Sequence, residues 1–271
     1  MPRSFPFILL FACADPATGT DDTSLLPGAD TADDTGNRAQ GTATIEATVT
    51  TVDGAPPAGL RVQYCRGILC ITPTDEDTSA HVYTFRNLPA GGGFFEVVAP
   101  RNSGFATVGA PFAIEDDAAE VLTVTMPALG EPASLPTTRE PLTLAPGLSV
   151  IASASDFPAA SPLDPNVDAL AAAAATDFGI PVDDPSTLVA VWHIEPYDLP
   201  AASPVGVSVD LEALGATDAF DDADAVLYVS DVEGGLWTRL GTLNREGDVL
   251  SDDAILTRTG TVLLRAEPTE D

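Results

Sequence analysis

Residues 45–64 read IEATVTTVDGAPPAGLRVQY, and this stretch decides the fold. Apolar and polar residues alternate over residues 45–49 and again over residues 60–64. Because successive side chains of a strand point to opposite faces, each run is typical of a half-buried β-strand. The Asp-Gly-Ala-Pro-Pro segment between the runs consists of turn-forming residues. The stretch therefore predicts two strands joined by a turn.

The alternation continues to residue 126, interrupted by turns such as LPAGGG at residues 88–93. Many short strands separated by Pro and Gly predict a mainly β protein built of antiparallel sandwiches. Three segments resemble the carboxypeptidase-regulatory-like domain, a transthyretin-like β-sandwich: DGAP at 53–56, LRV at 60–62 and YTFRNLPAG at 83–91. The resemblance predicts a domain over residues 41–129. It implies an accessory domain without catalytic residues.

Residues 130–271 are predicted to form a second β-rich domain after a Pro-rich connector at 128–141. Residues 188–194, LVAVWHI, are apolar on both faces, which predicts a central strand. One short helix is expected, with Asp164 as N-cap, Pro165 in its first turn and five alanines at 171–175. Residues 194–205 and the aromatic hairpin that follows are similar to ZU5-like sandwiches of bacterial surface proteins.

The N-terminus predicts export. Arg3 precedes the apolar run FPFILLFA at residues 5–12, which is typical of a secretory signal and too short to span a bilayer. Leu10-Phe11-Ala12-Cys13 resembles the lipobox of bacterial lipoproteins, which implies that residues 1–13 hold the signal and that Cys13 carries the lipid. Cleavage after Ala14 is the alternative, and it would release a soluble protein. Residues 14–40 are rich in Asp and Thr, which predicts a disordered tether.

The charge is strongly acidic. The chain has 41 acidic and 11 basic residues, for a net charge of −30, and it contains no lysine. Electrostatic repulsion makes nucleic acid and anionic lipid surfaces poor partners. The acidic surface keeps an exported protein soluble, and adaptation to a salty medium is an alternative reading. The missing lysine excludes a Walker A motif, a Schiff base and a Ser-x-x-Lys nucleophile.

Cys65 and Cys70 are predicted to form a disulfide, because oxidation is expected in an exported chain. Four residues lie between them, enough for a hairpin bend. A redox motif would need the Cys-x-x-Cys spacing. The disulfide is therefore expected to be structural.

No catalytic residue, cofactor or metal ligand is nominated. Only two histidines exist, His81 and His193, which excludes a three-histidine metal site. His193 lies in an apolar strand, where a hydrogen-bonded structural histidine is expected. A calcium ion is the remaining metal alternative, held by an acidic loop that contains Asp218, Asp221, Asp222 and Asp224.

These observations predict an exported, lipid-anchored, non-catalytic module of the cell envelope, at the outer membrane or cell surface. Its role is expected to be binding or structural, toward a cell-wall polymer or an envelope protein, with membrane contact through the N-terminal lipid alone. The alternative is a secreted hydrolase, or a hydrolase accessory protein, with an unrecognised carboxylate site. A cleft lined by carboxylates and by aromatic residues such as Trp192, Tyr197 or Trp237 would favour that alternative.

Overall fold

The computed structural model describes residues 41–52, 54–158, 167–175 and 178–269, which belong to one compact unit beginning at Ala39. The predicted leader, Cys13 and the tether lie outside the described residues, as do Asp53, Asp164 and Pro165. Among the described residues, no helix is long and apolar enough to cross a membrane.

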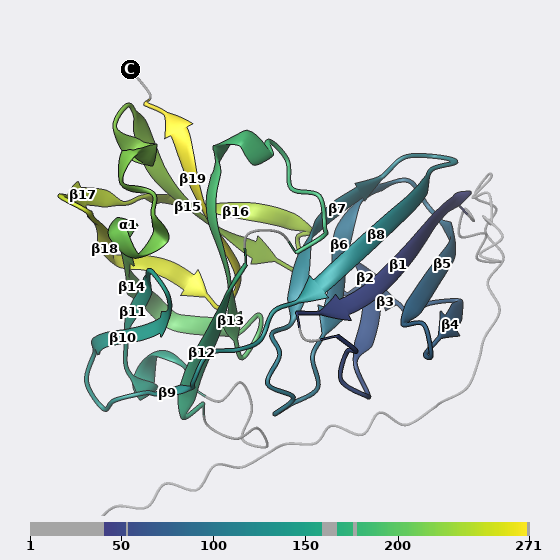
Figure 1. Ribbon diagram of the computed structural model, residues 1–271, viewed down its shortest axis with the longest axis horizontal. Coiled ribbons are helices and arrows are strands. Elements are labelled where there is room, and N and C mark those ends of the chain that lie inside the picture. The colour runs from purple at the N-terminus through teal and green to yellow at the C-terminus, as the bar shows by residue number, and fades with distance from the viewer. Residues whose placement is uncertain (1–40, 53, 159–166, 176–177, 270–271) are drawn as a thin grey trace, which may run out of the picture. The chain divides into compact units, whose positions relative to one another are not determined.

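Strands β1 to β8 form the first sandwich (Figure 1, purple to teal). One sheet has the order β4-β5-β1-β8 and the other β3-β2-β6-β7. The rings of Phe85 and Phe95, one from each sheet, meet edge to face with centroids 5.9 Å apart. The strands are β1 (Ala43–Thr51), β2 (Arg61–Arg66), β3 (Leu69–Ile71), β4 (Asp75–Asp77), β5 (Val82–Leu88), β6 (Gly91–Val98), β7 (Val108–Ile114) and β8 (Ala119–Met126).

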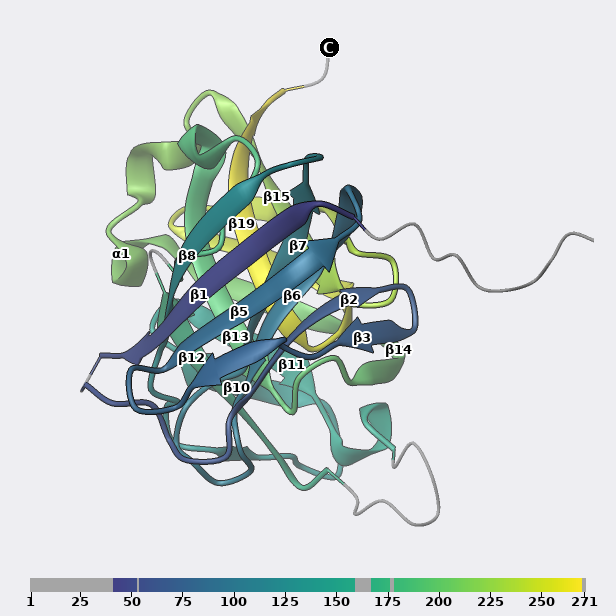
Figure 2. The same cartoon turned by 90° about the vertical axis from the view of Figure 1, so that its right-hand side faces the viewer.

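The alternation over residues 45–49 produces the expected strand. In β1 every second side chain is buried, beginning at Ala43. The neighbours of β1 are β5, which is antiparallel, and β8, which is parallel over eight residue pairs (Figure 2). The sandwich is therefore antiparallel except at this one edge pair.

The remaining strands form a second pair of sheets, with the orders β10-β11-β14-β18-β17 and β16-β15-β19-β13-β12-β9. Their shared core contains Trp192, Val207 and Leu264. The strands are β9 (Ala133–Ser134), β10 (Glu140–Ala145), β11 (Leu148–Ala152), β12 (Ala169–Ala175), β13 (Leu188–Glu195), β14 (Pro200–Asp210), β15 (Ala223–Asp231), β16 (Leu236–Thr242), β17 (Asn244–Glu246), β18 (Val249–Arg258) and β19 (Gly260–Pro268).

Strand β13 is central, as its sequence predicts. It lies between β19 and β12, and both of its faces are covered. Trp192 and Ile194 belong to the core of the second sandwich, whereas Val191 packs into the core of the first. Leu263 of β19 also packs into the first core. The two sandwiches thus share an apolar contact, and the predicted division near residue 130 stays a prediction.

The predicted helix is wrong. The alanine run forms strand β12, in which Ala171–Ala175 pair with Glu195–Val191 of β13. Alanine favours helix in isolation, but strand pairing and burial of Leu170 and Ala172 in the core override this weak preference. The one α-helix among the described residues is α1 (Leu211–Leu214), where Asp210 caps the first turn by accepting from Ala213 N. Three 3₁₀ turns complete the described structure: Ala154–Asp156, Pro185–Thr187 and Thr217–Phe220.

Candidate functional site

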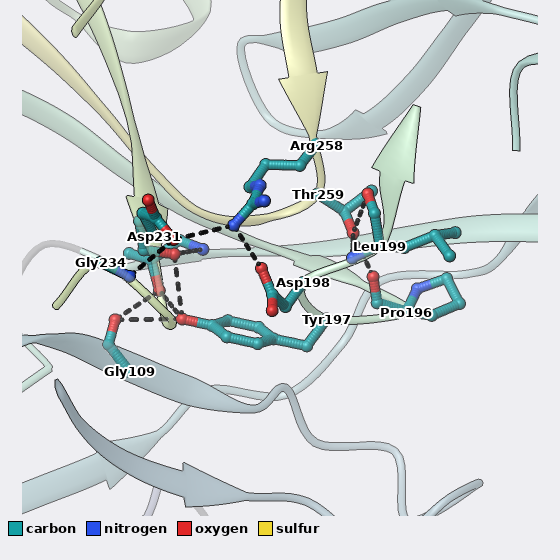
Figure 3. Close-up of polar contacts among 11 residues, drawn as sticks. Gly109, Pro196, Tyr197, Asp198, Leu199, Asp231, Gly234, Arg258 and Thr259 are labelled. Atoms are coloured by element: carbon teal, nitrogen blue, oxygen red, sulfur yellow. Dashed lines mark hydrogen bonds and ion pairs between the residues drawn. The ribbon is translucent and has the colours of Figure 1, made fainter. Parts of the chain in front are cut away.

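Polar side chains gather where β7 of the first sandwich meets β13, β15 and β19 of the second. We call Gly109, His193, Tyr197, Ser230 and Thr261 the polar seam. The Tyr197 hydroxyl lies 3.2 Å from the Gly109 carbonyl oxygen (Figure 3). It also lies 2.9 Å from Thr261 Oγ1 and 3.2 Å from Ser230 Oγ. Thr261 Oγ1 also donates to the Gly109 oxygen at 2.7 Å. Side chains of the second sandwich therefore bind the backbone of the first.

Position 109 requires a glycine because the side chains of Phe94 and Tyr197 lie against its backbone. A Cβ atom there would lie 2.5 Å from the Phe94 ring and 2.8 Å from the Tyr197 hydroxyl oxygen. Any larger residue would push the two sandwiches apart. Burial raises the pKa of Tyr197, so its hydroxyl stays protonated and remains a hydrogen-bond donor.

His193 is a buried structural histidine, as expected from its apolar strand. Its side chain is fully buried, and Nδ1 lies 3.0 Å from Thr261 Oγ1. The Phe178 ring packs edge-on against the imidazole at 5.3 Å. Burial lowers the pKa of His193 to about 3, so the ring is neutral at ordinary pH. Nε2 has no hydrogen-bond partner among the described residues.

The last residue of β13, Glu195, supplies a carboxylate that contacts the first sandwich. Glu195 Oε1 accepts a hydrogen bond of 2.6 Å from the backbone N–H of Thr107, which ties the second sandwich to the first a second time. Burial raises the pKa of Glu195, and the hydrogen bonds from Thr107 and Tyr197 oppose the rise. The Glu195–Pro196 peptide bond is cis.

Arg258 bridges two carboxylates beside the seam. Its Nη1 atom lies 3.0 Å from Asp198 Oδ1 and 3.1 Å from Asp231 Oδ1 (Figure 3). Asp231 also accepts from Gly234 N at 3.0 Å. Burial raises the pKa of Asp198, and the charge of Arg258 opposes the rise. Through Arg258, these carboxylates join the loop at Asp198, the end of β15 and the end of β18.

Cys65 and Cys70 form the predicted disulfide. They lie directly opposite each other in the β2–β3 hairpin, and their sulfurs are bonded. Cys65 is fully buried, whereas Cys70 is exposed. A feature that the sequence did not indicate lies next to them, namely the buried carboxylate of Glu96 on β6.

The structure does not assemble the acidic loop into a metal site. Among the described residues, only Cys65, Cys70 and Glu96 form a group of three or more ligand atoms within 4.8 Å of one another. Asp221 instead pairs with Arg245 at 3.0 Å. The residues expected to hold calcium are therefore not brought together.

The aromatic residues named for a cleft also lie elsewhere, and Trp237 packs half-buried against the core of the first sandwich. Trp192 is fully buried and donates to the Pro146 oxygen at 3.4 Å, and Tyr197 belongs to the seam. A groove of about 650 Å³ lies beside β13, lined by apolar residues such as Phe178, Ile180 and Val191. It joins no pair of carboxylates.

Sequence reasoning identified His193 and the disulfide but not the seam. Thr261 and Gly109 are 152 positions apart, so no local pattern connects them. The available signal was weak: a threonine at 261 and a serine at 230 stand next to the apolar runs of their strands. A buried hydroxyl needs a partner, so each of these positions predicts a hydrogen bond but not its acceptor.

The fold and the seam define the class: a mainly β protein of two sandwiches joined by buried polar and apolar contacts. No protein-family model matches the chain, and no curated protein matches it. Two solved structures are similar, the Bacillus anthracis TIE protein (9% identity, TM-score 0.26) and BcpA, the major pilin subunit of Bacillus cereus (11% identity, TM-score 0.26). The matches cover 85% and 84% of this chain, but only 32% and 60% of those chains. These scores are too low to assign a family.

Proposed function

We propose that the protein is an exported, lipid-anchored, non-catalytic module of the cell envelope with a binding or structural role. The observation that carries the non-catalytic part of the proposal is the polar seam. The His193 ring is fully buried, and the Tyr197 hydroxyl is engaged with Gly109, Ser230 and Thr261. A general base must reach its substrate within hydrogen-bond distance, and the seam already uses both side chains to join the two sandwiches.

The polar seam favours a role in which the two sandwiches form one rigid unit. Thr261 and Tyr197 bind Gly109, Glu195 binds Thr107, and Val191 and Leu263 enter the first core. These contacts mix buried hydrogen bonds with apolar packing, which resists relative motion of the sandwiches. We propose that residues 41–129 are the carboxypeptidase-regulatory-like domain and residues 130–271 its ZU5-like companion.

The anchor is tested by metabolic labelling with a fatty-acid analogue. We expect label on the wild-type chain in the membrane fraction, and no label on a Cys13→Ser variant. Cys65→Ser is the matched control, because it removes a different cysteine and leaves the leader intact. An unlabelled wild-type chain recovered freely soluble would overturn the anchor and support cleavage after Ala14.

The binding role is tested at the exposed apolar residues of the β2–β3 hairpin. The β2–β3 hairpin exposes 84% of Ile68 and 58% of Leu69. Exposed apolar groups on a disulfide-closed hairpin suit a protein partner better than a polymer rich in hydroxyls. We expect an Ile68→Ser/Leu69→Ser variant to lose cross-linking to a specific envelope protein, whereas Val121→Ser, at another exposed position, retains it. Cosedimentation of both variants with purified cell-wall polymer would point to the polymer instead.

The absence of catalysis is tested with chromogenic ester, glycoside and peptide substrates. We expect no turnover above that of a heat-denatured sample. Turnover that disappears when Glu96 or Asp198 is replaced by its amide would refute the proposal and favour the hydrolase alternative.

A further inference from the structure

The side chains of Cys65, Cys70 and Glu96 converge beside the sheet β3-β2-β6-β7, away from the core of the first sandwich. Cys65 and Gln63 alternate along β2 with the core residues Val62 and Tyr64, so they point to the opposite face. Glu96 lies directly across from Gln63 on β6. Cys65 Sγ is 3.9 Å from Glu96 Oε1, and one ligand atom from each of Cys65, Cys70 and Glu96 lies within 4.8 Å of the others.

The carboxylate of Glu96 is buried and forms no ion pair among the described residues. Its residue is only 6% exposed, and within the described residues it makes no salt bridge within 4.0 Å. Its hydrogen-bond partner is the uncharged amide of Gln63. Burial raises the pKa of Glu96, the Gln63 hydrogen bond and the charge of Arg61 oppose the rise, and the charge of Asp198 adds to it. A buried carboxylate without a direct ion pair is costly, and a bound cation would offset that cost.

We propose that, once the disulfide is reduced, the Cys65 and Cys70 thiolates and the Glu96 carboxylate bind one zinc-class divalent cation. Water or the Gln63 amide oxygen would take a fourth position. Two thiolates and a carboxylate are donors that zinc accepts in tetrahedral sites, whereas calcium prefers oxygen ligands alone. The disulfide occupies both sulfurs, so the oxidised protein does not bind the ion.

The switch balances as a thiol–disulfide exchange. A dithiol reductant gives two electrons and two protons to the Cys65–Cys70 disulfide, and the reductant itself becomes a disulfide. Zinc then displaces the two thiol protons to solvent and forms two Zn–S bonds. Cys70 is exposed, so the reductant and the ion both reach the site from the surface.

The test uses the full chain in a Cys13→Ser background, so that Cys65 and Cys70 are its only cysteines. The protein is reduced with a phosphine, freed of phosphine without air, and titrated with zinc against a chromophoric chelator. We expect one zinc ion per reduced chain and at least 100-fold weaker binding by the oxidised chain. Cobalt(II) in place of zinc should show thiolate-to-metal charge-transfer bands.

Two variants test whether Glu96 is a zinc ligand. Glu96→Gln keeps the size of the side chain and should weaken zinc binding at least tenfold. Glu76→Gln removes an exposed carboxylate on β4 and should leave binding unchanged. Binding by the reduced chain that is no tighter than binding by Cys65→Ser/Cys70→Ser would overturn the proposal. So would an unchanged affinity in Glu96→Gln.

Melting of the reduced chain separates a folded site from binding to unfolded thiols. A ligand that binds only the native state raises the melting temperature with its concentration. We expect zinc to raise the melting temperature of the reduced chain and to leave that of the oxidised chain unchanged. A zinc-bound reduced chain that melts no higher than the metal-free reduced chain would also overturn the proposal.

Discussion

Replacing Thr261 with valine should destabilise the protein by about 3 kcal/mol. The substitution keeps the shape of the side chain and removes one hydroxyl, which contacts three groups: His193 Nδ1 at 3.0 Å, the Tyr197 hydroxyl at 2.9 Å and the Gly109 oxygen at 2.7 Å. Nδ1 loses its hydrogen-bond partner in a fully buried place, which costs about 1–3 kcal/mol. The hydrogen bond from the Tyr197 hydroxyl to the Gly109 oxygen remains, so the loss of the Thr261 hydroxyl costs only about 0.5–1 kcal/mol of stability at each of these two groups.

The effect is measured by urea unfolding and by calorimetry. For a body of this size, about 3 kcal/mol corresponds to a fall in melting temperature of about 6–12 °C. Thr257→Val is the matched control, because Thr257 is an exposed threonine on β18, and it should change stability by less than about 0.5 kcal/mol. If Thr261→Val unfolds at the same urea concentration as the wild type, the seam does not hold the sandwiches together.

The double variant His193→Leu/Thr261→Val sharpens the test. Replacing both partners of a buried hydrogen bond by apolar groups leaves no unsatisfied nitrogen, so the double variant should be more stable than the sum of the single changes predicts. Strict additivity would show that His193 and Thr261 do not interact.

Three further predictions concern the backbone, the pH dependence and the disulfide. Gly179→Ala should lower the melting temperature strongly, because Gly179 has φ +79° and a Cβ atom would lie 1.7 Å from a backbone oxygen of β8. The control is Gly92→Ala, which should have a small effect because no atom lies within 4 Å of the added Cβ. Equal melting curves for the two variants would contradict this prediction. His193 is neutral when folded, with a pKa of about 3, and it gains a proton on unfolding below its ordinary pKa of about 6.5. The free energy of unfolding should therefore fall as the pH is lowered from 6.5 to 5, with a slope that approaches about 1.4 kcal/mol per pH unit at the lower end; His193→Phe should remove that part of the slope, and an unchanged slope would refute the assignment. Reducing the Cys65–Cys70 disulfide should cost about 2 kcal/mol, because it closes a short loop; mass spectrometry of protein isolated without reductant should show no free thiol at either position.

Local patterns predicted the strands well, because apolar and polar residues alternate along a strand that has one buried face. Strand β1 shows this, with Ile45, Ala47 and Val49 buried in turn. The alanine run failed for the opposite reason. Five identical small residues carry no period, so only the pairing of β12 with β13 decides between strand and helix, and that partner lies some twenty residues further along the chain.

The seam was beyond prediction because its members come from four strands and one loop. Each member looks unremarkable in its own segment, and only the packing of one sandwich on the other brings Gly109 to Thr261. The disulfide was predictable, since five positions separate its cysteines and the N-terminus predicts export. Its neighbour Glu96 was not, because β6 reaches the hairpin only through sheet pairing.

The excess of acidic over basic residues limits the kinds of partner that can bind the surface of this protein. All 11 basic residues are arginines, and several are engaged with internal acids. Arg258 bridges Asp198 and Asp231, and Arg139 holds Asp156 with two of its nitrogens, a geometry that the single ammonium of lysine does not offer. Arginines committed in this way leave much of the acidic excess facing solvent without a counterion. We therefore expect a partner of this surface to be neutral, cationic or bridged by cations, because a polyanion would be repelled. Binding to an anionic polymer that persists without divalent cations would contradict this argument.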